Sequence, residues 1–184
     1  MRQLPNIITS VRILLVIPIM VLLAYGQFAL VLLLFAIAAL SDGLDGWLAR
    51  RFGWQSRLGA ILDPLADKVM LVGCYLILGW LTLLPLWLVV LVILRDVVII
   101  AGALAYRWRC GELEMEPSLI SKLNTLLQMA LGLLVIIAAA GLATPPWLLD
   151  AGILVVAATT LWSGLAYVLV WSRRARACRE GGGG

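Results

Sequence analysis

Residues 42–50 read Asp-Gly-Leu-Asp-Gly-Trp-Leu-Ala-Arg, and residues 59–67 read Gly-Ala-Ile-Leu-Asp-Pro-Leu-Ala-Asp. The two stretches bring four carboxylates into an otherwise apolar chain, namely Asp42, Asp45, Asp63 and Asp67. Within each stretch the carboxylates are three or four residues apart, so on a helix each pair lies on one face. Converging carboxylates repel one another in a low-dielectric site unless cations lie between them, and oxygen-only ligands favour hard divalent ions. The pattern therefore predicts a site for Mg²⁺ or Mn²⁺, with two ions expected.

The composition fixes the class of protein. Hydrophobic residues make up 64% of the 184 positions and charged residues only 13%, and the mean hydropathy is +1.07. Such a chain is too apolar for a soluble domain and is typical of a helical protein that crosses the lipid bilayer several times. No histidine is present, which leaves carboxylates, lysine and arginine for catalysis. Nothing in the sequence indicates a nucleic-acid partner.

The apolar segments predict an all-α fold with six transmembrane helices. These cover residues 11–24, 28–48, 58–81, 86–106, 117–140 and 147–171. A short N-terminal segment before the first span is expected to lie along the membrane surface. We interpret residues 1–180 as a single membrane domain and residues 181–184 as a flexible glycine tail.

The basic residues predict the orientation of these spans. None of the fourteen lysines and arginines falls in the three predicted outer turns, residues 25–27, 82–85 and 141–146. Because cytoplasmic loops of membrane proteins carry the excess of Lys and Arg, both termini and the carboxylates are expected on the cytoplasmic side. The corresponding side in a mitochondrion is the matrix, so the bacterial inner membrane and the mitochondrial inner membrane are both expected locations.

The spacing of the carboxylates resembles a known signature. The pattern Asp42-x-x-Asp45-Gly46-x-x-Ala49-Arg50, followed after eight residues by Gly59-x-x-x-Asp63-x-x-x-Asp67, looks like the complete signature of the CDP-alcohol phosphotransferase family of phospholipid-synthesising membrane enzymes. The resemblance implies that an alcohol attacks the diphosphate of a CDP-linked lipid such as CDP-diacylglycerol and releases CMP. It also implies a homodimer.

The resemblance assigns roles to the residues of the signature. The four aspartates would hold the divalent metal, and Asp67 would also accept the proton of the attacking hydroxyl as general base. Two glycines and an alanine would leave room for the nucleotide, and an arginine would pair with a phosphate or with the carboxylates. The predicted CDP-lipid-binding residues are Gly46, Gly59, Ala49 and Arg50.

The acceptor alcohol is predicted from two further stretches, Arg95-Asp96 and Ser121-Lys122-Leu-Asn124-Thr125. The bacterial phosphatidylglycerophosphate synthases of this family usually carry Arg-Glu and Gly-Lys-x-Lys-Thr there. The present residues instead resemble the eukaryotic-type, CMP-forming cardiolipin synthases, whose acceptor is phosphatidylglycerol. A lysine replaced by Asn124 suits a singly charged diester better than dianionic glycerol 3-phosphate. Arg95, Lys122 and Asn124 are therefore the predicted acceptor-binding residues.

Several alternatives stay open at this point. Glycerol 3-phosphate is the alternative acceptor, and Arg95 and Asp96 could simply pair with each other or with neighbouring groups. A divalent-cation transporter also presents carboxylates inside the membrane, although its site should lie near the midplane on broken helices. A metal-dependent prenyltransferase uses aspartates for a diphosphate as well, but with a different spacing and normally with more than six spans.

Overall fold

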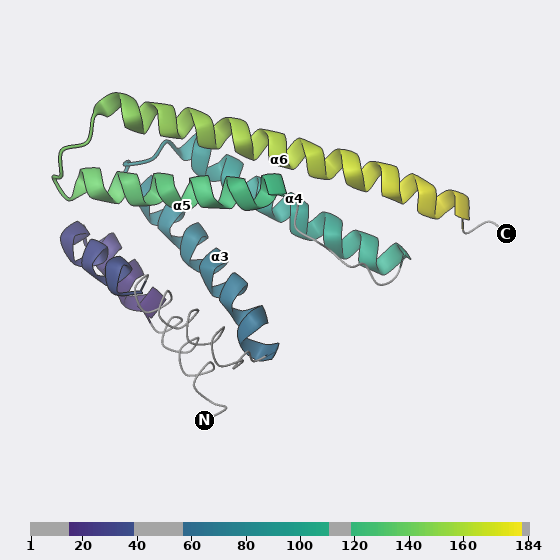
Figure 1. Ribbon diagram of the computed structural model, residues 1–184, viewed down its shortest axis with the longest axis horizontal. Coiled ribbons are helices and arrows are strands. Elements are labelled where there is room, and N and C mark those ends of the chain that lie inside the picture. The colour runs from purple at the N-terminus through teal and green to yellow at the C-terminus, as the bar shows by residue number, and fades with distance from the viewer. Residues whose placement is uncertain (1–14, 39–56, 111–118, 182–184) are drawn as a thin grey trace. The chain divides into compact units, whose positions relative to one another are not determined.

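The computed structural model describes the backbone of residues 15–38, 57–110 and 119–181, and side-chain surroundings for residues 15–38, 68–102, 104, 108 and 119–169 (Figure 1). Every regular element in these ranges is a helix, which confirms the predicted all-α class. The helices are Leu15–Ala24, Phe28–Ala38, α3 (Arg57–Trp80), α4 (Leu86–Cys110), α5 (Leu119–Ala139) and α6 (Pro146–Gly181). The helices α3 and α4 start and end close to the boundaries of the predicted segments 58–81 and 86–106. Parts of the predicted segments 11–24, 28–48 and 117–140 lie outside the described residues.

The chain divides into two compact units. The first comprises residues 1–84 and 132–144 and contains the helix Leu15–Ala24, the helix Phe28–Ala38 and α3. Its core includes Leu23, Tyr75 and Leu78, which are each at most 1% exposed. The helix Leu15–Ala24 approaches α3 closely at Gly73, where an added Cβ would lie 2.8 Å from the Met20 sulfur. The missing side chain at Gly73 therefore allows these two helices to pack.

Three helices end in the same type of C-terminal cap, and all three caps lie in chain segments of the first unit. At Gly26, Thr82 and Gly141 the backbone is left-handed, with φ of 71°, 58° and 82°. In each case the next amide donates to the carbonyl five residues back: Gln27 to Leu22, Leu83 to Leu78, and Leu142 to Ile137, at 2.9, 2.9 and 3.3 Å. This is the Schellman arrangement, which satisfies carbonyls at a helix C-terminus. The caps lie in the three predicted outer turns, where they end the preceding helices.

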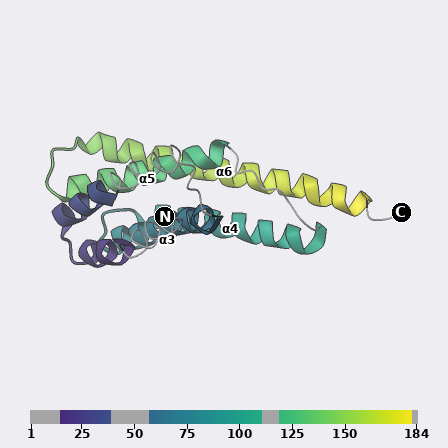
Figure 2. The ribbon, with the colours of Figure 1, turned by 60° about the horizontal axis from the view of Figure 1, so that its bottom comes forward.

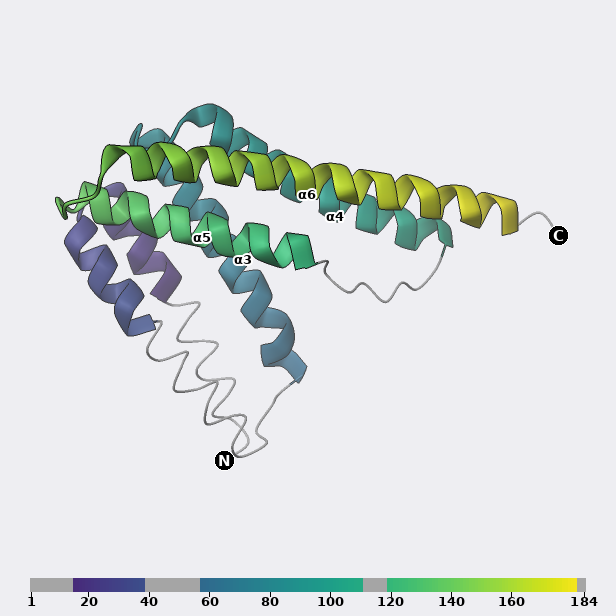
Figure 3. The same cartoon turned by 45° about the horizontal axis from the view of Figure 1, so that its top comes forward.

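The second unit comprises residues 85–131 and 145–184 and contains α4, the first part of α5, and α6. In this unit α4 packs against α6. Residues 124 and 128 of α5 contact residues 159 and 160 of α6. Ser121 of α5 and Ser163 of α6 accept from the same nitrogen of Arg95, whereas Asn124, further along α5, bonds to Thr160, earlier along α6. The two helices are therefore antiparallel, and a short connection joins them (Figure 3).

The second unit has polar groups inside and apolar groups outside. Six polar or charged side chains among its described residues are at most 5% exposed: Arg95, Asp96, Asn124, Gln128, Thr160 and Ser163. On the outside of α6, Leu154, Leu161 and Leu165 are more than half exposed. Extended apolar surface around a polar interior indicates contact with lipid.

Among the described residues, two helices are long and apolar enough to cross a membrane, namely α5 and residues Pro146–Leu169 of α6. The prediction of six spans is thus supported in part and stays a prediction for the other four. The helix α6 differs from its predicted extent, because it continues unbroken to Gly181 instead of ending at Trp171 (Figure 2). At 1.5 Å per residue its 36 residues span about 54 Å, against about 30 Å for a bilayer core. Its last turns therefore extend beyond the hydrocarbon if α6 crosses the membrane.

Candidate functional site

The signature residues fall partly within the described structure. Gly59, Asp63 and Asp67 all lie on α3, and the two aspartates are one turn apart on one face, as predicted. Their side chains are outside the described part. The remaining signature residues, Asp42, Asp45, Gly46, Ala49 and Arg50, lie outside the described residues altogether. The convergence of the four carboxylates therefore stays a prediction. Asp63 and Asp67, its second pair, have the helical spacing that it requires.

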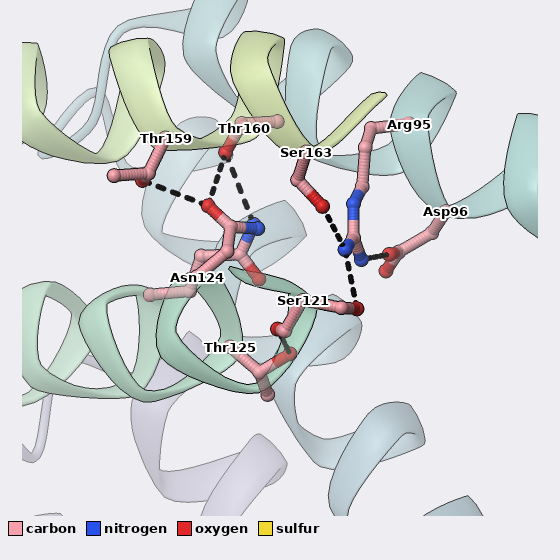
Figure 4. Close-up of polar contacts among 9 residues, drawn as sticks. Arg95, Asp96, Ser121, Asn124, Thr125, Thr159, Thr160 and Ser163 are labelled. Atoms are coloured by element: carbon pink, nitrogen blue, oxygen red, sulfur yellow. Dashed lines mark hydrogen bonds and ion pairs between the residues drawn. The ribbon is translucent and has the colours of Figure 1, made fainter. Parts of the chain in front are cut away.

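The predicted acceptor-binding residue Arg95 lies in a buried polar cluster, the Arg95 cluster, formed with Asp96, Ser121 and Ser163 (Figure 4). Its Nη1 donates to Asp96 Oδ1 at 2.9 Å. Its Nη2 donates to Ser121 Oγ at 2.6 Å and to Ser163 Oγ at 2.5 Å. Arg95 is 5% exposed, so the cluster joins α4, α5 and α6 around one desolvated guanidinium.

One N–H donor of the Arg95 guanidinium has no acceptor among the described residues. A guanidinium has five N–H groups, and the three hydrogen bonds above use only its two terminal nitrogens. Its Nε is buried and has no hydrogen-bond partner among the described residues. A buried donor without an acceptor is costly, by about 1–3 kcal/mol or more for a charged group. This N–H is therefore suited to an oxygen atom supplied from elsewhere, such as that of a phosphate.

A second buried cluster surrounds Asn124, which is fully buried. Its Oδ1 accepts from Thr159 Oγ1 at 2.8 Å and from Thr160 Oγ1 at 3.0 Å. Gln128 Nε2 donates to Thr160 Oγ1 at 3.3 Å, which leaves the Thr160 proton for Asn124. The Asn124 Nδ2 is buried and has no partner within the described ranges. Like Arg95, Asn124 thus presents a spare donor in an orientation fixed by α6.

The third predicted acceptor-binding residue, Lys122, is exposed. It lines a shallow depression of about 350 Å³ together with Ser121, Thr125, Leu126 and Met129. Ser121 is shared by this depression and the Arg95 cluster. The depression therefore has a polar end, where a cation and a hydroxyl are available, followed by apolar side chains further along α5.

Sequence reasoning did not identify the partners on α6, namely Thr159, Thr160 and Ser163, or Gln128 on α5. A signal was present, because polar residues recur on α5 at positions 121, 124 and 128 and on α6 at 160 and 163. Spacings of three and four place such residues on one helix face. Which faces meet, however, depends on the packing of α5 against α6.

The family model described as CDP-alcohol phosphatidyltransferase matches residues 2–171. The chain belongs to this family. The CMP-forming cardiolipin synthases of Rattus norvegicus and Homo sapiens are 36% and 35% identical over 157 residues, which is 77% of this chain and 50% of each relative. The CDP-diacylglycerol–glycerol-3-phosphate 3-phosphatidyltransferase of Salmonella choleraesuis is 35% identical over 184 residues, 90% of this chain and 93% of the relative. The chain thus spans about half the length of the cardiolipin synthases it matches.

The family is named for phosphatidyl transfer that involves a CDP-alcohol. The family generally depends on divalent metals. Together with the two membrane-length helices in the described part of the chain, the family membership indicates a membrane protein. It disfavours the alternatives of a cation transporter and a prenyltransferase. Both kinds of acceptor, however, are represented among the relatives.

Proposed function

We propose that this enzyme transfers the phosphatidyl group of CDP-diacylglycerol to phosphatidylglycerol, giving cardiolipin and CMP. The observation that carries the proposal is the charge of the acceptor region. Asp96 is paired with Arg95 at 2.9 Å, so these two charges offset each other, and Lys122 is left as the net positive charge of the three. One net positive charge suits the single negative charge of a phosphodiester better than the two charges of glycerol 3-phosphate.

The acceptor-binding residues have distinct tasks in this proposal. Lys122, at the polar end of the depression, attracts the phosphodiester from the membrane surface. The Arg95 Nε–H and the Asn124 Nδ2–H, the two buried donors without a partner among the described residues, donate to oxygens of the phosphodiester or of the glycerol. An acceptor that satisfies both donors is favoured over one that leaves either buried and unpaired.

The donor half of the proposal rests on the signature. Asp42, Asp45, Asp63 and Asp67 would hold one or two divalent ions, Mg²⁺ or Mn²⁺, and the register of Asp63 and Asp67 on α3 fits that task. When bound, such ions neutralise the charge of the diphosphate leaving group.

The remaining signature residues bind the donor and move the proton. Asp67 takes the proton from the acceptor hydroxyl. Gly46, Ala49 and Gly59 leave space for the nucleotide, and Arg50 pairs with a phosphate.

The surroundings of the site complete the proposal. We place six spans in the bacterial inner membrane or the mitochondrial inner membrane, with both termini and the active site on the cytoplasmic or matrix side. The enzyme is proposed to work as a homodimer. The acyl chains of donor and acceptor remain in the lipid, which adjoins the apolar outer faces of α4 and α6.

The test is a CMP-release assay with purified protein, CDP-diacylglycerol and Mg²⁺ or Mn²⁺. Phosphatidylglycerol and glycerol 3-phosphate are compared as acceptors, and the lipid product is identified by mass spectrometry. Metal-dependent CMP release with phosphatidylglycerol, with cardiolipin as product, is the expected result. CMP release with glycerol 3-phosphate alone would contradict the proposed acceptor.

Phosphatidylglycerophosphate synthesis is the second candidate. It is favoured by the Salmonella choleraesuis relative, which matches 90% of this chain and is itself covered over 93% of its length. The cardiolipin synthases match 77% of the chain and are covered over half. The same assay decides between the two, because the acceptor is the only substrate that differs.

A further inference from the structure

Ser163 has a buried hydroxyl to which the proposed reaction assigns no role. It is fully buried on α6, and its Oγ accepts from Arg95 Nη2 at 2.5 Å. Ser121, on α5, accepts from the same nitrogen at 2.6 Å. Two hydroxyls from two different helices therefore hold one end of the guanidinium, as the close-up shows (Figure 4).

The ion pair with Asp96 alone does not orient the guanidinium. Arg95 and Asp96 are sequence neighbours on α4, so their ion pair ties the guanidinium only to its own helix. An arginine side chain also has about 2 kcal/mol of rotamer entropy to lose when it is fixed. The contacts from α5 and α6 supply the constraints that a neighbour on α4 cannot provide.

Stability is a weak reason to keep such a cluster. Burying an ion pair is often no better for stability than packing apolar residues of similar volume. In the second unit a carboxylate and two hydroxyls nevertheless accept hydrogen bonds from one buried arginine. The same arginine still has a buried Nε without a partner in the described part of the chain. The cluster is therefore better explained as holding that N–H donor ready for a substrate oxygen.

We propose that Ser163 is a positioning residue of the acceptor site, which acts by fixing the Arg95 guanidinium so that its Nε–H is presented to the acceptor. This inference rests on the proposed function, because it assumes that Arg95 binds the acceptor. It assigns to α6 a part in acceptor binding that the family signature, located in residues 42–67, does not contain. Removal of the Ser163 hydroxyl should weaken acceptor binding and leave donor binding unchanged.

The test compares Ser163→Ala with a matched control, Gly164→Ala, on the full-length protein. Gly164 is the next residue of α6, and its added Cβ would lie 3.6 Å from Arg95 Cγ, which is an ordinary van der Waals contact. This substitution removes no hydrogen-bonding side chain. The KM for the acceptor, the KM for CDP-diacylglycerol and kcat are measured for both variants and the wild type. Loss of one hydrogen bond to a charged group should raise the acceptor KM of Ser163→Ala about tenfold.

The split between the two KM values separates positioning from general packing. An acceptor KM raised about tenfold with the donor KM unchanged supports the proposal. An acceptor KM within about twofold of Gly164→Ala, or equal increases in both KM values, overturns it. If Ser163→Ala does not accumulate as folded protein, Ser121→Ala is measured against the same criteria, because Ser121 is only partly buried.

The outcome is distinguishable from a failure of the proposed function. Wild-type turnover with glycerol 3-phosphate in place of phosphatidylglycerol would overturn the proposed acceptor. The KM comparison is then made with glycerol 3-phosphate, whose phosphate also accepts hydrogen bonds, and the same criteria apply.

Discussion

Replacing Thr160 by valine should destabilise the protein clearly more than the same replacement at its neighbour Thr159. Thr160 is fully buried, donates to Asn124 Oδ1 at 3.0 Å and accepts from Gln128 Nε2 at 3.3 Å. Valine has nearly the same shape and the same branching at Cβ, so the helix backbone of α6 is little affected. The replacement removes both hydrogen bonds and no others that are described for this residue.

The expected magnitudes follow from these contacts. Each hydrogen bond contributes a net free energy of about 0.5–1.5 kcal/mol in soluble proteins and about 0.6 kcal/mol on average between membrane helices. Thr160→Val should therefore lower the free energy of unfolding by about 1–2 kcal/mol.

Thr159 differs because its hydroxyl lies 2.9 Å from the Val155 carbonyl as well as 2.8 Å from Asn124 Oδ1. Its single proton is shared between these acceptors, and Asn124 keeps the Thr160 bond. Thr159→Val should cost about 0.5 kcal/mol or less.

The two variants form a matched pair on adjacent residues of one helix. Unfolding in mixed micelles by increasing denaturing detergent can be followed by the fluorescence of the eight tryptophans. A larger loss at Thr160 confirms that Asn124 is held mainly by the buried hydroxyl. Equal losses, or a larger loss at Thr159, would refute the described geometry of the Asn124 cluster.

Three further predictions concern the metal, the acceptor and the turns. Asp63→Asn should abolish CMP release while the protein still inserts into membranes, because it removes one predicted metal ligand; retained turnover would contradict that assignment. Lys122→Ala should raise the acceptor KM about tenfold and change the unfolding free energy by less than about 0.5 kcal/mol, because Lys122 is exposed; an unchanged acceptor KM would exclude Lys122 from the site. Thr82→Gly should stabilise the protein by about 1 kcal/mol and Gly141→Ala should destabilise it by a similar amount, because both positions have positive φ. Thermal unfolding in detergent measures both changes. A destabilised Thr82→Gly variant or a stabilised Gly141→Ala variant would count against the left-handed caps.

The helical caps illustrate how far local sequence determines structure. Gly26 and Gly141 were expected in turns, since glycine adopts a left-handed conformation without steric cost. The third turn uses Thr82 at φ 58°, which no residue preference predicts. The surrounding helix ends determine that conformation, and the threonine adopts it at a cost in strain.

The extent of α6 was predicted less well for a related reason. Hydropathy marks where apolar residues end, and it therefore placed the end of the span at Trp171. The helix continues to Gly181, because arginine and alanine are good helix formers and need no apolar environment. Hydropathy thus identifies a membrane segment and does not identify the end of a helix.

The sequence by itself determined the class of protein, the places of its helices, the register of Asp63 and Asp67, and the family. These depend on composition, periodicity and fixed spacing, which are local properties of the chain. Only the tertiary structure decided that Arg95 donates hydrogen bonds to hydroxyls of α5 and α6 and that Asn124 accepts hydrogen bonds from two threonines of α6. The partners lie between 26 and 68 residues apart along the chain, and which polar faces meet is decided by the packing of whole helices.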